Sequence, residues 1–318
     1  MSDASIVVIG NANVDLTTYL KRAPETGETV LGHGFSIGMG GKGANQAVAA
    51  ARAGANVCFL GRVGNDAFGD QVVTALTSEG LDLTQMDRVD TDTAVASIYV
   101  EDSGANRIAV YPGASGTLTG AEIETALGHC DGGKILVSQL EVDHQVVLAA
   151  LTAATKKQMV TVLNIAPFNV LAPGILDHTT WLIANEVELE GVMGSLGVTL
   201  SLEGMSVDEV CEAISSWSEK LGCHLIITLG EQGAVGFMDG ACFSYTAYAT
   251  QAIDTVGAGD CFVGYFVALL DQRLPWQQAL AGGVIAATQS VQSPGAQSSY
   301  PSRSDAAAIK DQATSVTF

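Results

Sequence analysis

The chain has 318 residues, of which 47% are hydrophobic and only 6% aromatic, so its core must be built mainly from Ala, Val, Leu and Ile. This length suits one large α/β domain or two ordinary domains. Lys and Arg number 14 against 34 Asp and Glu, giving a formal net charge of −20. Such a field repels nucleic acid, which we exclude as a partner. A bound phosphate must be held locally by backbone amides, a helix N-terminus, a metal or one placed lysine.

No targeting or anchoring segment is predicted. The N-terminus runs directly into the apolar segment 6–10, without the basic and apolar regions of a signal peptide. No apolar run reaches the ~18 residues that a membrane span needs. We therefore expect a cytoplasmic protein with no membrane partner.

The cysteines lack the C-x-x-C spacing of zinc sites. Most lie in apolar surroundings, and we expect reduced core thiols: Cys58, Cys130, Cys211, Cys223, Cys242 and Cys261. The five histidines show no paired ligand spacing either.

The first part of the chain mixes two kinds of element. Residues 5–10 and 57–60 are short apolar runs, typical of buried strands. Residues 44–53 predict an Ala-rich helix stopped at Gly54, and residues 68–79 a helix ended by Gly80. Residues 17–37 scatter apolar side chains among Thr, Gly and Ser, which indicates short, half-exposed strands.

The segments 94–100 and 107–111 flank Asp102–Asn106 and predict a β-hairpin. This hairpin and the segment 17–37 interrupt the pattern of the chain. We interpret them as one small sheet inserted into a larger domain.

From about residue 121, predicted strands and helices alternate. The alternation predicts an α/β fold with a mostly parallel sheet and helices on both faces. Its strands are 134–138, 159–163, 181–184 and 224–228, its helices 121–128, 144–156, 206–221, 259–271 and 276–290, and residues 303–318 are expected to form a loose terminal helix.

The segment Asp254–Phe262 carries the strongest chemical signal. The glycines at 257 and 259 let backbone N–H groups converge at the start of an apolar helix, where the dipole favours an anion. Asp260 opens that helix and could accept a proton from an attacking hydroxyl. The residues alone leave open that Asp260 merely caps the helix.

A glycine-rich run spans Gly38–Gly43 and matches G-x-G-x-x-G. The dinucleotide fingerprint should follow the first strand of a βαβ unit, but that strand ends far upstream at Gly10. The run is not a Walker loop, because Gly43 follows Lys42 where Ser or Thr is required. It predicts a turn whose backbone approaches a ligand, with Lys42 and Asn45 offering polar groups, or a plain entry to the helix.

Polar residues follow several predicted strands. Asn13 and Asp15 are spaced by two, so both can point to one side and hold adjacent sugar hydroxyls, although a turn is the alternative. Parallel strands end at the same edge of a sheet, where α/β proteins place ligands. The joint occurrence of polar residues after successive strands, at Glu141, Asn164, Asn185 and Glu188, predicts one shared site at this edge. The glycine-rich turn Thr228–Gly233 could admit the phosphates or ribose of a nucleotide, or be a tight turn between strands.

These motifs resemble the ribokinase, or PfkB-type, carbohydrate kinases over nearly the whole chain. Gly40–Ala47 resembles the N-terminal signature of that family, and Asp254–Asp260 resembles its C-terminal signature. Their order and separation match as well. The resemblance implies a three-layer α/β/α fold and ATP-dependent transfer of phosphate to a sugar.

The resemblance also implies roles for individual residues. Asp260 would be the catalytic base, and the amides of Gly257, Ala258 and Gly259 would form the anion hole. The sugar would be held by Asn13, Asp15, Gly41, Lys42, Asn45 and Glu141. Asn185, Thr228, Gly230, Gly233 and Gly259 would bind ATP, with Glu188 acting indirectly on Mg²⁺. A monovalent cation site, normally for K⁺, would be formed by Asp254, Val256, Ser290, Ser293, Gly295 and Ser299.

The resemblance further implies two parts. A large catalytic domain would comprise 1–15, 39–92 and 113–318, and a β-sheet lid 16–38 and 93–112. The lid would pair two subunits into a homodimer and exclude water from the reaction.

Ribose is the favoured acceptor, phosphorylated at its 5-hydroxyl. Departures from the common family pattern at Ser115, Ile165 and Cys261 leave deoxyribose, another sugar or a nucleoside open. A more remote alternative is an NAD(P)-dependent oxidoreductase, suggested only by Gly38–Gly43. Another is a non-catalytic sugar or nucleotide sensor, which would have no need of the base.

Overall fold

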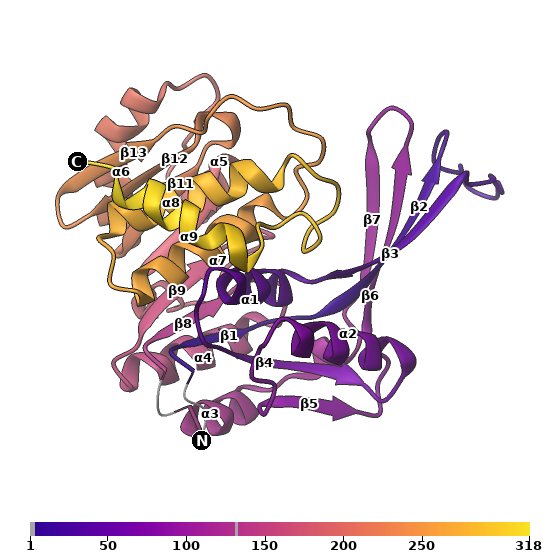
Figure 1. Cartoon of the computed structure of the whole chain (residues 1–318). Helices are drawn as coiled ribbons and strands as arrows, with labels where there is room; N and C mark the ends of the chain where they lie inside the picture. Colours follow the sequence, from indigo (N-terminus) through magenta and orange to yellow (C-terminus); the bar gives the residue numbers. More distant parts are fainter. Residues whose placement is uncertain (1–3, 131–132) are drawn as a thin grey trace.

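The structure, a computed structural model, describes residues 4–130 and 133–318. A large sheet is covered by helices on both faces, and a smaller sheet projects away from this body (Figure 1). Residues 1–3 of the predicted large domain lie outside the described residues. Within the described residues, no helix is both long and apolar enough to cross a membrane.

The large sheet has nine strands in the order β13-β12-β11-β10-β9-β8-β1-β4-β5. The strands from β11 to β5 pair in parallel, whereas β12 and β13 are antiparallel to their neighbours. Its strands are β1 (Ile6–Ile9), β4 (Val57–Gly64), β5 (Met86–Val89), β8 (Ile135–Ser138), β9 (Val160–Asn164), β10 (Trp181–Asn185), β11 (His224–Thr228), β12 (Ala234–Met238) and β13 (Ala241–Tyr245).

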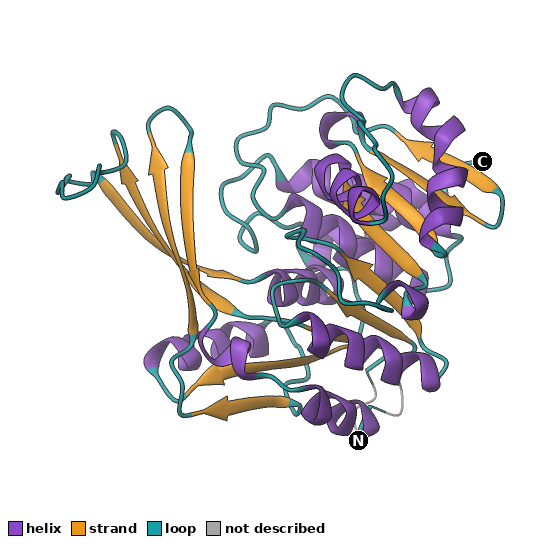
Figure 2. Cartoon of the chain, turned by 180° about the vertical axis from the view of Figure 1, so that it is seen from behind, coloured by secondary structure: helices purple, strands orange, loops and turns teal. Residues whose placement is uncertain are grey.

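Alternate side chains of the large sheet enter two separate cores. In β1, Ile6 and Val8 point into one core, while Val7 and Ile9 point into the other. The first core is completed by α1 (Lys42–Arg52), α2 (Ala67–Ser78), α7 (Ala258–Asp271), α8 (Trp276–Ser290) and α9 (Arg303–Thr314). The second is completed by α3 (Gly120–Gly128), α4 (His144–Lys156), α5 (Glu186–Ser195) and α6 (Val207–Leu221). The result is a three-layer α/β/α body (Figure 2).

The smaller sheet has four strands in the order β3-β2-β6-β7. They are β2 (Asn13–Leu20), β3 (Gly34–Gly40), β6 (Ala94–Glu101) and β7 (Asn106–Tyr111). β2 leaves the large sheet shortly after β1, and β3 returns directly into α1. The base of the smaller sheet therefore adjoins the carboxyl edge of the large sheet.

The sequence predicted most of these elements. The α/β fold, the mostly parallel sheet, the hairpin of β6 and β7 and the terminal helix are confirmed. The elements β5, β12, β13 and α5 were not predicted, and α1 begins two residues earlier than expected. The α1 helix starts at Lys42 because Gly41, with φ 91°, already turns the chain at the N-cap.

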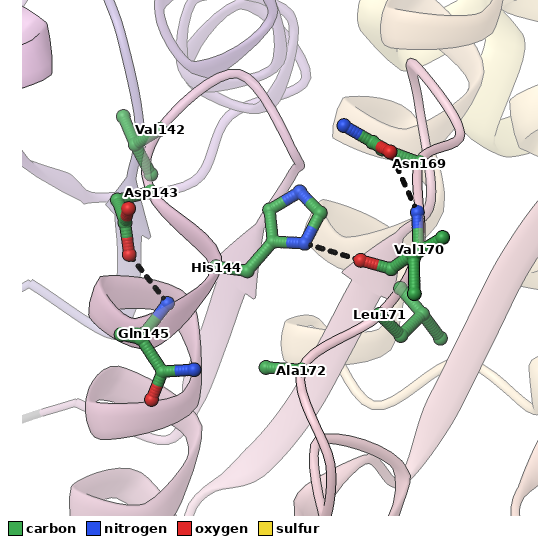
Figure 3. A pocket seen from close by; sticks show the side chains of 8 residues that line it. All are labelled: Val142, Asp143, His144, Gln145, Asn169, Val170, Leu171 and Ala172. Carbon is green, nitrogen blue, oxygen red and sulfur yellow. Dashed lines mark hydrogen bonds between the residues drawn. The ribbon is translucent and has the colours of Figure 1, made fainter.

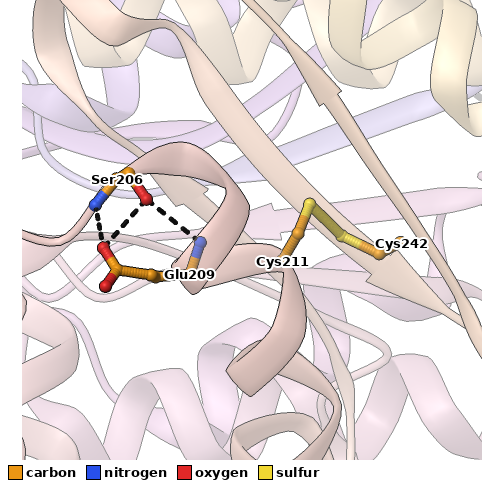
Figure 4. Close-up of a disulfide and its surroundings, with 4 residues drawn as sticks. All are labelled: Ser206, Glu209, Cys211 and Cys242. Atoms are coloured by element: carbon orange, nitrogen blue, oxygen red, sulfur yellow. Dashed lines mark hydrogen bonds between the residues drawn. A yellow bond between two sulfur atoms is a disulfide. The ribbon is translucent and has the colours of Figure 1, made fainter.

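One prediction about the cysteines is wrong. Cys211 on α6 and Cys242 on β13 form a disulfide instead of remaining reduced (Figure 4). The helix packs against the antiparallel edge of the sheet, which brings together two cysteines separated by 31 residues. Cys58, Cys130, Cys223 and Cys261 are buried thiols, as expected.

Candidate active site

A cavity of about 210 Å³ lies at the carboxyl edge of the large sheet. Three of its lining residues end consecutive parallel strands: Asn164 ends β9, Asn185 ends β10 and Thr228 ends β11. The α7 N-terminus forms another wall. The complete lining comprises Lys42, Asn164, Ala166, Ile183, Asn185, Glu188, Thr228, Thr255, Gly257, Gly259 and Asp260.

The α7 helix begins with a tight left-handed turn at Gly257, whose φ is 75°. A Cβ at this position would stand 2.6 Å from the hydroxyl of Tyr300 and 2.8 Å from the Cβ of Ala296, so only glycine fits. The Ala258 N–H donates to the Thr255 carbonyl at 3.3 Å and is thus engaged in the turn. Gly257 and Gly259 line the cavity, where the helix dipole favours an anion.

Asp260 lies in the first turn of α7 and is only 5% exposed. Its two carboxylate oxygens accept hydrogen bonds from different side chains of α1. Asn45 Nδ2 donates to Oδ2 at 3.0 Å, and Gln46 Nε2 donates to Oδ1 at 2.9 Å. The predicted base is therefore a buried carboxylate that faces the cavity and is fixed by neutral donors.

Lys42 brings the positive charge of the site. Burial lowers the pKa of its ammonium, but the carboxylates of Asp260, Glu141 and Glu188 outweigh burial and leave the pKa raised. The lysine is thus firmly protonated among three acids. Its own backbone N–H donates to Glu141 Oε2 at 2.8 Å, which joins the start of α1 to the loop after β8.

Glu141 and Glu188 are themselves perturbed. Burial raises the pKa of both carboxyls, and the Lys42 charge opposes the rise in each case. Perturbed titratable groups that converge in a cavity are typical of functional sites.

Asn13 and Asp15 lie on the same face at the start of β2, as their spacing predicted. Asn13 Nδ2 donates to Asp15 Oδ1 at 2.6 Å. Burial raises the pKa of Asp15 to about 6, the hydrogen bond from Asn13 lowers it, and nearby Glu141 raises it further. A Cβ at Gly41 would lie 2.8 Å from Asn13 Oδ1, so a glycine at this position leaves room for the Asn13 side chain.

Asn185 and Glu188 form a reciprocal cap at the start of α5. Asn185 Oδ1 accepts from the Glu188 N–H at 2.8 Å, and Glu188 Oε2 accepts from the Asn185 N–H at 2.9 Å. Both also line the cavity with Thr228. Gly230 and Gly233 continue past Thr228 in a short 3₁₀ turn, and they are not among the lining residues.

Of the residues predicted to bind a monovalent cation, Val256 and Gly295 contact the Asp254 carboxylate. Its Oδ1 accepts from the Val256 N–H at 3.0 Å and its Oδ2 from the Gly295 N–H at 2.8 Å. The Ser290 and Ser299 hydroxyls donate to the Ala287 and Ala296 carbonyls. Carboxylate, carbonyl and hydroxyl oxygens are the donors that hard cations prefer, so the residues present fit such an ion.

A second, larger cavity of about 470 Å³ lies between the N-terminus of α4 and the loop after β9 (Figure 3). His144 Nδ1 donates to the Val170 carbonyl at 2.8 Å across it. None of the predicted site residues lines this cavity, which is formed by residues 142–145 and 169–172. The smaller cavity, by contrast, is lined by seven of the residues with a role implied by the family resemblance: Lys42, Asn185, Glu188, Thr228, Gly257, Gly259 and Asp260.

Several residues of the site were not predicted from the sequence. Thr255 lines the cavity, and Gln46, Gln139 and Gln297 are buried in its hydrogen-bond network. Gln46 stands inside the signature Gly40–Ala47, which was the available signal. Gln139 and Gln297 lie in no recognised motif.

The chain is similar to known carbohydrate kinases over nearly its whole length. Residues 3–303 match the model of the pfkB family of carbohydrate kinases. A deoxyribokinase of Salmonella typhi is 36% identical over 302 residues, covering 93% of this chain and 95% of the relative. A ribokinase of Schizosaccharomyces pombe is 35% identical over 306 residues, covering 94% and 95%. The structure of Arabidopsis thaliana ribokinase complexed with ribose and ATP superimposes with a TM-score of 0.85 at 26% identity, covering 98% of this chain and 99% of the other.

The fold and the buried carboxylate beside a helix N-terminus thus define an ATP-dependent sugar kinase. The chain belongs to the pfkB family of carbohydrate kinases. The two remote alternatives from the sequence, an NAD(P)-dependent oxidoreductase and a non-catalytic sensor, are therefore not supported.

Proposed function

We propose that this kinase phosphorylates D-ribose at its 5-hydroxyl, with deoxyribose as the second candidate. One observation carries the kinase mechanism: Asp260 is buried at the N-terminus of α7 and held by two amide donors in the cavity. The relatives named deoxyribokinase and ribokinase are 36% and 35% identical, so their similarity does not separate the two acceptors.

The proposed reaction starts with the sugar hydroxyl beside Asp260. The carboxylate takes the hydroxyl proton as the oxygen bonds to the γ-phosphorus of ATP, and the bond to the β-phosphate oxygen breaks to release ADP. The N–H groups at Gly257, Ala258 and Gly259 stabilise the charge on the transferred group. Because the Ala258 N–H is engaged in the turn, we expect Gly257 and Gly259 to contribute more.

The sugar would be held on the side of Asp260 that faces away from the transferred phosphoryl group. Asn13, Asp15 and Glu141 offer acceptors for sugar hydroxyls, while Lys42 and Asn45 offer donors, and Gly41 leaves room for the ring. This arrangement of closely spaced acceptors suits a small polyhydroxylated molecule.

The nucleotide would lie along the ends of β10 and β11. Asn185 and Thr228 would contact ATP within the cavity. Gly230 and Gly233 would contact the nucleotide just outside the cavity. Glu188 would act on Mg²⁺ indirectly, since the metal is held mostly by phosphate oxygens and water. Mg²⁺ would neutralise charge on the phosphates, and K⁺ at Asp254 would order the loop that leads into α7.

The smaller sheet supports a second part of the proposal. We assign 16–38 and 93–112 to a lid over the sugar and 1–15, 39–92 and 113–318 to the catalytic domain. Opposite the face that carries Asp15, the sheet exposes Phe35 (62%), Ile37 (50%), Tyr99 and Tyr111. An exposed apolar face of this kind suits a homodimer through the lid. A cytoplasmic location, where ATP is available, completes the proposal.

The test is ADP formation with ribose, deoxyribose, fructose, adenosine and pseudouridine as acceptors. With Mg²⁺ and K⁺ present, we expect kcat/KM for ribose to exceed that for every other acceptor. A higher value for deoxyribose would keep the mechanism and transfer the specificity to the second candidate. Turnover with none of these acceptors would contradict the assigned substrate class.

A further inference from the structure

A network of neutral amide side chains surrounds Asp260. Asn45, Gln46, Gln139, Asn164 and Gln297 are all buried, and hydrogen bonds join them into two branches that meet at this carboxylate. They come from α1, the end of β8, the end of β9 and the turn before α9. Such a concentration of buried amides is costly unless each is well paired.

The first branch runs through Gln46. Its Nε2 donates to Asp260 Oδ1 at 2.9 Å and to Asn164 Oδ1 at 3.0 Å, which uses both N–H groups of the amide. Its Oε1 accepts from Gln139 Nε2 at 2.7 Å. If the Gln46 amide were reversed, its oxygen would face the Asp260 carboxylate and its nitrogen would face the Gln139 donor. Asn164 Nδ2 donates to the Ile183 carbonyl at 3.1 Å, which leaves Asn164 Oδ1 as a fixed acceptor. Asn164 Oδ1 and the Asp260 carboxylate therefore allow only the orientation in which Gln46 Nε2 donates.

The second branch runs through Asn45 and follows the same logic. Asn45 Nδ2 donates to Asp260 Oδ2 at 3.0 Å, while its Oδ1 accepts from Gln297 Nε2 at 3.0 Å. The Asp260 carboxylate and the Gln297 donor thus both favour this orientation of the Asn45 amide. Each Asp260 oxygen receives one fixed N–H and keeps lone-pair capacity for a proton.

The backbone is shaped to allow these contacts. A Cβ at Gly264 of α7 would overlap the Ala49 Cβ and lie 2.7 Å from the Gln46 carbonyl, so this glycine lets α7 approach α1 closely. A Cβ at Gly10 would overlap Gln139 Oε1. Gly264 thus makes room for the α1 backbone at Gln46, and Gly10 makes room for the side chain of Gln139 in the same branch.

Neutral donors suit a base better than an ion pair would. A carboxylate that is bonded bidentately to an arginine loses much of its basicity, because the opposite charge strongly stabilises the anion. Two amide N–H groups fix the carboxylate geometry and stabilise the anion more weakly. The two amide donors thus hold the Asp260 carboxyl group in place without the opposing charge of an ion pair.

We propose that Gln46 is the positioning residue for the base of this kinase, with its amide orientation set by Asn164 and its oxygen held by the Gln139 donor. The proposal rests on the proposed role of Asp260 as the base. Gln46 orients one carboxylate oxygen of Asp260 by donating a hydrogen bond to it.

Kinetics of Gln46→Met as a function of pH test the proposal. Loss of one donor to a carboxylate should lower kcat about 10- to 100-fold and leave the sugar KM nearly unchanged. The acidic limb of the kcat profile should move to higher pH, because the Asp260 anion loses a stabilising partner. Gln46→Glu keeps the size of the side chain and should move this limb further, since two adjacent carboxyls then share a proton.

Gln272→Met is the matched control. Gln272 also bridges α7 to α1, donating through Nε2 to the Ala53 carbonyl at 2.9 Å, but at the opposite end of both helices. The Gln272→Met variant should have a lower melting temperature but the same pH profile of kcat as the wild type. A folded Gln46→Glu with the wild-type profile would overturn the proposal, as would the same shift in Gln272→Met.

A double-mutant cycle separates this proposal from the proposed function. If Gln46 acts through Asp260, adding Gln46→Met to Asp260→Asn should cause no further loss of turnover. Equal losses in both backgrounds would contradict the positioning role while leaving the base intact. Full turnover of Asp260→Asn alone would instead remove the base itself.

Discussion

The two sheets of this kinase differ in what their side chains contact. The strands β1 and β4 are buried along their entire length, whereas every residue of β7 is exposed. The large sheet is covered by helices on both faces, and the small one stands free beyond its base (Figure 1). The large sheet thus supplies the stability of the fold, while the small sheet offers the surfaces proposed for a substrate and a second subunit. The candidate active site lies where they meet.

The largest expected difference between the two sheets is the effect of a side-chain truncation on the free energy of unfolding. Phe59→Ala in β4 removes a fully buried ring and should lower the free energy of unfolding by about 3–5 kcal/mol. Ile108→Ala in β7 removes a side chain that is 57% exposed and should change it by less than about 0.5 kcal/mol. Denaturant unfolding of the two variants measures both values. Similar losses would show that the small sheet contributes to the core after all.

The proposed subunit contact can be tested on the outer face of the small sheet. Ile37→Asp places a charge in the exposed apolar face and should weaken dimerisation at least about 10-fold, since a buried unpaired charge is costly. Analytical ultracentrifugation gives the dissociation constant. Val187→Asp on α5, an exposed apolar position (73%, against 50% for Ile37) away from this sheet, is the control. A wild-type protein that is monomeric at high concentration would refute the contact.

Asp15 lies at the junction between the two sheets, and replacing it tests how its buried charge affects stability. Because burial raises the pKa of Asp15 to about 6 from its ordinary value of 3.8, the folded protein binds this proton more tightly than the unfolded chain. Between these two pKa values the free energy of unfolding falls as the pH rises. Above both values Asp15 is ionised in the folded protein, and burial of its charge destabilises the fold by the full amount. Asp15→Asn should therefore stabilise the protein by on the order of 1–3 kcal/mol near neutral pH.

The gain from Asp15→Asn should be smaller at about pH 5, since the wild-type carboxyl is then mostly protonated. The same variant should raise the KM of the sugar, because an ionised acceptor for hydroxyls is lost. Urea unfolding at the two pH values and the sugar KM measure both effects. An equal gain in stability at the two pH values would contradict the attribution of this gain to the buried Asp15 charge.

The sequence predicted the elements whose patterns are simple. The runs at β8, β10 and β11 are short, apolar and buried, and all were found. The strand β5 (MDRV) is polar, and β12 contains Gly236, so neither has the pattern of a buried strand. The helix α5 carries glycines at 191 and 194, which weaken its helical signal. It is held by the cap at Asn185 and by packing of Leu189 and Val192.

The candidate site was predictable as far as local motifs reached. Asp260, Lys42 and Asn45 stand within two short signatures, and the structure brings them together. The partners of Asn45 and Gln46 could not be found in this way. Gln297 is 252 positions from Asn45, and Gln139 is 93 positions from Gln46, so only the fold creates these contacts. The Cys211–Cys242 disulfide was missed for the same reason.

The most direct measurement of the central claim is turnover and sugar binding by Asp260→Asn. Asparagine keeps the shape of the side chain but cannot accept the hydroxyl proton, so kcat should fall by about 10²–10⁴-fold. Binding of ribose and ATP, measured by titration calorimetry, should remain within a few-fold of the wild-type values. A variant with near-wild-type kcat would show that Asp260 is not the base and would contradict the account of this site.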